Sequence, residues 1–329
     1  MTVEQTHAPR SRHGQGDHQF DADLTWGELP EEWEMGDVGA VGVDADDNVY
    51  VFNRGEHPMI VFDRDGRFLR SWGEGVFTRA HGLHIGPDGF AYCTDDGDHT
   101  VRKCTLEGEV VLSIGIPGQP SEFMSGQPFH RCTHTALSPS GDIYVSDGYG
   151  NACVHQYSER GELIRTWGGP GSDAGEFYLP HNICCDRDGW VYVADRENHR
   201  IQIFDGAGRY ETQWNNLYRP CGLFLDNAPD PHMYVGELGP IFRSGTPYPP
   251  NLGARVSVLD RHGHPLSRVG GATMGTGPLE FVAPHGIAAD TRGDVYVGET
   301  TNFAWPLIFG EPVPADGLTT LRKLVRRTA

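Results

Sequence analysis

Residues 178–196 read YLPHNICCDRDGWVYVADR, and residues 282–300 repeat the pattern as VAPHGIAADTRGDVYVGET. Four further copies of the unit begin at Gly39, His81, Thr133 and Cys221. Each copy has a short apolar strand, a turn rich in Asp and Gly, and a second strand of the Val-Tyr-Val type, which predicts a β-hairpin. Most copies continue into a third strand such as RIQIFD and a fourth such as ELIRTWG.

Four strands in a repeat of about 40 residues are typical of a β-propeller blade, and six copies predict a six-bladed ring. The 44 glycines and 23 prolines suit many short strands joined by tight turns. The last repeat ends at its third strand, TTLRKLVRR, and the segment FDADLTWGEL from Phe20 can supply the fourth. The sequence therefore predicts an all-β fold: a disordered polar tail over residues 1–19, then a six-bladed β-propeller over residues 20–329 closed by an N-terminal strand.

The formal charge of −19 argues against nucleic acid or an anionic membrane as a partner, because both require a basic surface. No run of about 18 apolar residues could span a membrane, and the opening MTVEQTHAPRSRHGQGDHQ lacks the apolar segment of a signal peptide. The seven cysteines are scattered without a Cys-x-x-Cys pair, which favours free thiols in a reducing compartment and a cytoplasmic location.

The first residues of the innermost strands form a ring at one mouth of the central channel. In blade order they are Gly39, His81, Thr133, His181, Cys221 and His285. The histidines fall on alternate blades, which lie ~120° apart in a six-membered ring, so His81, His181 and His285 converge on the axis. Three neutral imidazoles with an open fourth position are a catalytic zinc arrangement. The alternative is three channel histidines solvated by water.

The second strands end at the same mouth, and their last positions carry Arg54, Asp96, Tyr149, Arg196, Leu238 and Thr300. Arg54 and Arg196 could bind a carboxylate, and Tyr149 near cations could have a lowered pKa and act as a base. The preceding Asp95, Asp147 and Asp195 fit the repeat and are expected to form turns. The pattern ADRENHRIQIF is that of NHL repeats, in which His99 and His199 hold structural positions.

Residues 20–329 resemble the peptidyl-α-hydroxyglycine α-amidating lyase family, most closely in VSDGYGNACVHQYSERGELIRTWG and YLPHNICCDRDGWVYVADRENHRIQIF. That family is a six-bladed propeller with a tri-histidine zinc site. The resemblance implies zinc at His81, His181 and His285. It also implies a catalytic tyrosine at Tyr149 and active-site arginines at Arg54, in FNRGEH, and Arg196.

The chain departs from that family at several positions. The aspartate that binds a structural calcium ion is Gly286 here, which argues against calcium, and a pocket methionine is Ala283. The family's disulfide positions are His130, Gly150, Tyr192 and Ile203, which fits a reducing compartment. No copper-dependent hydroxylating domain precedes the propeller, so we expect a small carboxylate-bearing substrate and not a long peptide.

The resemblance implies a zinc-dependent lyase that cleaves the C–N bond of a carbinolamide, giving an amide and an aldehyde such as glyoxylate. Zinc would bind the carbinol oxygen and lower its pKa, and Tyr149 would remove the proton. Arg54 would favour the phenolate of Tyr149, and Arg54 or Arg196 would anchor the substrate carboxylate. Two alternatives stay open: a metal-dependent hydrolase of a lactone or amide, and a non-catalytic NHL binding module.

Overall fold

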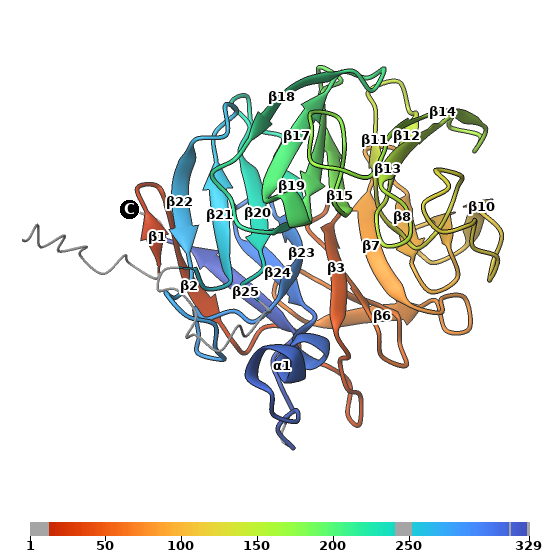
Figure 1. Cartoon of the computed structure of the whole chain (residues 1–329). Coiled ribbons are helices and arrows are strands. Elements are labelled where there is room, and N and C mark those ends of the chain that lie inside the picture. The colour runs from red at the N-terminus through yellow and green to blue at the C-terminus, as the bar shows by residue number, and fades with distance from the viewer. Residues whose placement is uncertain (1–12, 241–251, 316, 328–329) are drawn as a thin grey trace, which may run out of the picture.

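The computed structural model describes residues 13–240, 252–315 and 317–327. Its strands form six antiparallel sheets arranged radially about a central axis, like the blades of a propeller (Figure 1). Five sheets hold four strands from one contiguous stretch of chain, and the sixth takes strands from both ends of the chain. The six-bladed β-propeller predicted from the repeats is therefore confirmed.

The innermost strands are the first strands of the six hairpins. They are β3 (Val38–Val43), β7 (Ala80–Ile85), β11 (Cys132–Leu137), β15 (Pro180–Cys185), β19 (Pro220–Leu225) and β23 (Pro284–Ala289). The second strands are β4 (Val49–Asn53), β8 (Ala91–Asp95), β12 (Ile143–Asp147), β16 (Val191–Asp195), β20 (Met233–Glu237) and β24 (Val295–Glu299). Both sets are almost wholly buried, because neighbouring blades cover their faces.

The third strands are β5 (Met59–Phe62), β9 (Thr100–Cys104), β13 (Cys153–Tyr157), β17 (Arg200–Phe204), β21 (Arg255–Leu259) and β25 (Leu321–Arg326). The outer strands are β6 (Phe68–Trp72), β10 (Val110–Ile114), β14 (Leu163–Gly168), β18 (Tyr210–Trp214) and β22 (Pro265–Val269). These outer strands lie at the rim of the ring in Figure 1 and carry many of the exposed side chains.

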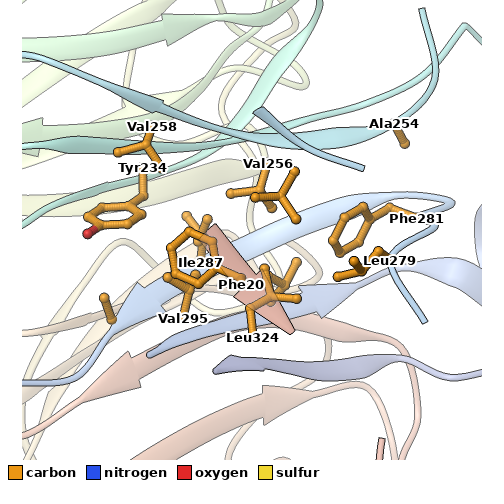
Figure 2. Close-up of a cluster of buried hydrophobic side chains, with 13 residues drawn as sticks. Phe20, Tyr234, Ala254, Val256, Val258, Leu279, Phe281, Ile287, Val295 and Leu324 are labelled. Atoms are coloured by element: carbon orange, nitrogen blue, oxygen red, sulfur yellow. The ribbon is translucent and has the colours of Figure 1, made fainter. Parts of the chain in front are cut away.

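The N-terminal strand β2 (His18–Asp23) closes the ring by pairing antiparallel with β25, with Phe20 opposite Arg326. Phe20 is 1% exposed and lies in an apolar cluster with Leu324 and Ile287 of blade six and Val256 of blade five (Figure 2). Burying a phenylalanine of this kind stabilises a fold by about 1.5–3 kcal/mol. The predicted closing strand is therefore confirmed.

The predicted boundary of the disordered tail is wrong for residues 13–19. Strand β1 (Gly14–Gln15) pairs with β2, and the backbone N–H of Phe20 donates to the oxygen of His13 at 2.7 Å. These residues therefore belong to the closing blade. Residues 1–12, the rest of the predicted tail, lie outside the described residues.

The aspartates at the ends of the second strands hold the loop that enters the same blade. Asp95 accepts from the N–H groups of Thr78 and Arg79, and Asp147 accepts from His130. Asp195 accepts from the N–H of Tyr178 at 2.7 Å. Because buried N–H groups need acceptors, these carboxylates are structural, as predicted.

His99 and His199 are also structural. Both lie in the left-handed region, with φ of 64° and 56°. The Nδ1 atom of His99 accepts from the N–H of Arg131, and that of His199 accepts from Arg219. Each imidazole thus ties the turn into a third strand to the start of the next blade, as predicted.

One helix, α1 (Thr301–Phe309), follows β24 in blade six, and Asp37 caps its first turn by accepting from the N–H groups of Asn302 and Phe303. The short η1 (Arg196–Asn198) follows β16. In the described ranges, no helix is long and apolar enough to cross a membrane. The blade-five loop of residues 238–253 falls mostly on residues 241–251, outside the described residues.

Candidate active site

The six ring residues occupy the same irregular position in every blade. In each hairpin the pairing register shifts by one residue at the second position of the inner strand, as between Pro180 and Asn182 or between Pro284 and Gly286. The skipped residues are Gly39, His81, Thr133, His181, Cys221 and His285. Such a β-bulge leaves its residue out of the ladder and redirects its side chain and carbonyl.

Each ring histidine uses the freed carbonyl of the next blade. The Nδ1 atom of His81 lies 2.7 Å from the oxygen of Thr133, and that of His181 lies 2.9 Å from the oxygen of Cys221. His285 closes the circle at 2.7 Å from the oxygen of Gly39. A carbonyl can only accept, so each Nδ1 carries the hydrogen and each Nε2 keeps a free lone pair.

The three imidazoles converge. Their ring centroids lie 4.6–5.0 Å apart, and one nitrogen of each lies within 4.8 Å of the others. Burial lowers the pKa of all three imidazoles well below the usual value. Nearby positive charge lowers it further: the charge of His285 acts on His81, and that of Arg196 acts on His181. Neutral, oriented imidazoles whose other nitrogen is hydrogen-bonded are the form that binds a transition metal, so the residues present fit the predicted zinc.

Tyr149, which follows β12, lies directly at this triad. Its hydroxyl oxygen is 3.1 Å from Nε2 of His81 and 3.1 Å from Nε2 of His181. Burial raises the pKa of Tyr149, while Arg196 and Arg54 lower it. The expected lowered pKa is therefore not produced by the arginines, because the cost of burying the phenolate exceeds their attraction.

The two predicted arginines, Arg196 and Arg54, both lie at the site but have different hydrogen-bond partners. The Arg196 Nε donates to Glu197 at 2.8 Å, and its Cζ lies 5.7 Å from the centroid of the Tyr149 ring. The Arg54 Nε donates to the backbone oxygen of Ala80, and among the described residues no carboxylate lies within ion-pair distance of it. Burial and the charge of Arg79 lower the pKa of Arg54. Arg54 is thus a partly buried guanidinium without a carboxylate partner among the described residues.

Three further arginines at this mouth were missed by the sequence reasoning. Arg79 and Arg131 both donate to Oδ2 of Asp96, at 2.9 and 2.6 Å, and the Arg131 Cζ lies 4.7 Å from the centroid of the Tyr149 ring. Arg219 pairs with Glu197. Arg79, Arg131 and Arg219 each stand two residues before a ring residue, a repeated signal that the sequence carries.

Two other residues close to the histidine triad, Cys221 and His134, are not part of its group of possible metal ligands. The Cys221 Sγ lies 3.3 Å from Nδ1 of His181 and 3.8 Å from Nε2. Burial raises the pKa of the Cys221 thiol to about 11. His134, one residue past Thr133, contacts the oxygen of Thr135 through Nδ1.

The departures from the amidating-lyase pattern also have structural counterparts. The N–H of Gly150 donates to the oxygen of His130 at 2.9 Å, and Tyr192 lies opposite Ile203 across β16 and β17. All seven cysteines fall within the described residues, and none forms a disulfide there. A Cβ at Gly286 would come within 2.4 Å of the Ala40 Cα, so the fold has no room for a side chain at the expected calcium position.

Comparison with known proteins identifies the class of the chain as that of NHL repeat proteins. A family model described as NHL repeat matches residues 177–204, the loop into blade four with β15, β16 and β17. The chain is 32% identical over 295 residues to human NHL repeat-containing protein 3, covering 84% of this chain and 80% of that protein. The chain therefore belongs to the family of NHL repeat-containing proteins.

Other relatives bear enzyme names. The chain is 31% identical to peptidyl-alpha-hydroxyglycine alpha-amidating lyase 1 of Drosophila melanogaster, over 71% of this chain and 45% of that protein. It is 29% identical to peptidyl-glycine alpha-amidating monooxygenase B of Xenopus laevis, over 83% of this chain and 34% of that protein. The chain thus spans less than half the length of these two relatives.

A solved structure supports the fold. The streptogramin B lyase structure matches with a TM-score of 0.57 at 15% identity, covering 90% of this chain and 96% of that chain. The propeller architecture is shared, and at this identity the likeness concerns the fold.

Proposed function

We propose that the protein is a zinc-dependent lyase that cleaves the C–N bond of a small, carboxylate-bearing carbinolamide to an amide and an aldehyde. The observation that carries the proposal is the position of Tyr149, whose hydroxyl lies 3.1 Å from the Nε2 atoms of two histidines of the triad. The similarity to the Drosophila lyase supports the same reaction class.

A zinc ion held by Nε2 of His81, His181 and His285 would supply Lewis-acid polarisation of an oxygen and a positive charge that favours the Tyr149 phenolate. Arg54 and Arg196 assist that ionisation, because both lower the pKa of Tyr149 against its burial. Tyr149 would then accept the proton of the carbinol hydroxyl as general base.

The reaction balances without a covalent intermediate. In R–CO–NH–CH(OH)–COO⁻ the O–H and C–N bonds break, the C=O bond of the aldehyde forms, and the amide nitrogen receives the proton. Tyr149 can return that proton, so the enzyme ends in its starting state. The products are R–CO–NH₂ and glyoxylate.

Arg54 would anchor the substrate carboxylate. It is partly buried and lacks a carboxylate partner among the described residues, and a planar guanidinium binds a carboxylate through two parallel hydrogen bonds. Arg196 is already held by Glu197, so its proposed role is electrostatic support of Tyr149. This division refines the sequence expectation, which left the anchor open between the two arginines.

The test is an assay of zinc-loaded protein with N-acyl-α-hydroxyglycines, following glyoxylate release. Matched lactones and simple amides serve as hydrolase substrates. Zinc-dependent glyoxylate release that disappears in Tyr149→Phe is the expected result. Turnover of lactones or amides to acids, with no release from any carbinolamide, would identify a hydrolase. A zinc-loaded protein inert to both would favour a binding propeller.

A further inference from the structure

A second group of metal-ligand side chains lies inside blade three, away from the channel residues that the proposed reaction uses. Asp147 ends β12, and Cys153 and His155 lie on the adjacent strand β13. Asp147 and His155 are fully buried and Cys153 is 2% exposed. One ligand atom of each lies within 4.8 Å of the other two.

The other blades show what these positions normally hold. The carboxylate that ends the second strand is paired with an arginine of the third strand in four blades. The pairs are Asp95 with Arg102, Asp195 with Arg200, Glu237 with Arg255, and Glu299 with Arg322. These arginines neutralise a buried carboxylate, which is costly to bury alone.

Blade three replaces both arginine positions with metal ligands. Cys153 lies opposite Asp147 in the strand pairing, as Arg200 lies opposite Asp195 and Arg255 opposite Glu237. His155 stands two residues further along, where blade two carries Arg102 opposite Cys93. The carboxylate is retained and the guanidinium is exchanged for a thiol and an imidazole.

The distances match the edges of a tetrahedral zinc site. The Cys153 Sγ lies 3.5 Å from Nε2 of His155, and that nitrogen lies 3.3 Å from Oδ2 of Asp147. Zinc bonds of about 2.3 Å to sulfur and about 2.0–2.1 Å to nitrogen and oxygen require edges of ~3.6 and ~3.3 Å. Two of the three distances in this group therefore have the lengths that a zinc ion would impose, and all three ligand atoms lie within 4.8 Å of one another.

The surroundings orient two of the three ligands. The second imidazole nitrogen of His155, Nδ1, lies 2.8 Å from the hydroxyl of Thr166. Asp147 Oδ2 receives the side-chain N–H of Asn151 at 2.8 Å and the N–H of His130 at 3.0 Å. Hydrogen bonds of this kind hold ligating imidazoles and carboxylates in place in metal sites.

We propose that Asp147, Cys153 and His155 bind a structural zinc ion within blade three, in place of the arginine that neutralises the corresponding carboxylate elsewhere. Binding releases the Cys153 thiol proton, so that a thiolate, a carboxylate and Zn²⁺ sum to zero charge in a buried position. A water molecule would supply the fourth ligand. The ion ties β12 to β13 two residues before Tyr149 in the chain.

Metal analysis of the full chain and its variants tests the proposal independently of catalysis. The wild type should hold about two zinc equivalents, and the triple variant His81→Ala, His181→Ala, His285→Ala should keep about one. Adding Cys153→Ser to the triple variant should remove the remaining equivalent, whereas adding Cys184→Ser as a matched control should not. A folded triple variant that holds no zinc would overturn the proposal.

Cobalt substitution separates the two sites even if a variant fails to fold, because only thiolate ligation gives a near-ultraviolet sulfur-to-cobalt charge-transfer band. The wild-type protein and the triple variant should both show the band, and Cys153→Ser should lose it. The Cys221→Ser variant should keep it. A band lost in Cys221→Ser and retained in Cys153→Ser would overturn the proposal by placing the thiolate at the channel triad, and a wild-type protein without any band would also overturn it.

Discussion

The Nδ1 atom of His285 lies 2.7 Å from the backbone oxygen of Gly39, 246 residues earlier in the chain. Each residue stands at the β-bulge of its inner strand, and the two strands belong to neighbouring blades. The bulge frees the carbonyl of Gly39 from its ladder, and this carbonyl fixes the tautomer of the histidine from blade six. The same exchange repeats twice around the ring, so the three Nε2 lone pairs face one axial point before any ligand binds.

Removing one triad imidazole should therefore remove the channel metal. We expect His181→Ala to lose about one zinc equivalent and nearly all lyase activity, because two imidazoles no longer enclose the ion. His134→Ala is the matched control, since His134 is also buried but is not part of the triad. Equal metal loss in both variants, measured by mass spectrometry of native protein, would contradict the assignment.

Tyr149→Phe keeps the ring under the Arg131 and Arg196 guanidiniums and removes only the hydroxyl. Fold and zinc content should be retained. Loss of a general base slows a step by about 10²–10⁴-fold, so kcat should fall in that range with a smaller change in KM. Steady-state kinetics at several pH values measure the effect, and a near-normal kcat would exclude Tyr149 from the chemistry.

Arg54→Lys should weaken substrate binding, because an ammonium group is a point charge and cannot form the paired hydrogen bonds of a guanidinium. We expect KM to rise by about tenfold or more for a carboxylate-bearing substrate, the equivalent of about 1.4 kcal/mol. The exposed Arg187, which donates to backbone oxygens of Asn227 and Ala228, provides the control substitution. Equal KM values in the two variants would remove Arg54 as the anchor.

Calcium should not contribute to stability, because residue 286 has no side chain and no space for one. A Cβ there would meet the Ala40 Cα at 2.4 Å, so Gly286→Asp should destabilise the fold by roughly 1–3 kcal/mol through overpacking. Thermal melts with and without EGTA, at saturating zinc, should coincide in the wild type. A melting temperature restored by calcium alone would show a calcium site built from other groups.

The repeat made most of the fold predictable, because a hairpin pattern that recurs six times specifies both the blade and the ring. The triad followed from symmetry, since His81, His181 and His285 fall on alternate blades. The bulges did not follow, because a one-residue register shift is set by pairing between strands and leaves no local composition signal. The burial of Tyr149, which raises its pKa against the attraction of Arg196 and Arg54, did not follow from the sequence either.

The last prediction concerns acid stability of the protein stripped of metal. Burial lowers the pKa of His84 to about 4 and that of His134 to about 3, and burial also lowers those of the triad. These imidazoles stay neutral in the folded protein, whereas the unfolded chain protonates them below a pKa of about 6.5. The unfolded state then binds more protons, so the free energy of unfolding must fall as the pH is lowered from about 6.5 to 5.

Each such histidine lowers the free energy of unfolding by up to about 1.4 kcal/mol for each pH unit of acidification in that window. We expect His84→Asn to reduce the slope of unfolding free energy against pH by about that amount, as measured by urea denaturation of metal-free protein. His264 is 76% exposed at its side chain, and His264→Asn provides the control substitution. An unfolding free energy that is flat from pH 6.5 to 5 would mean that the channel histidines are protonated in the folded state, which would also contradict their readiness to bind a metal.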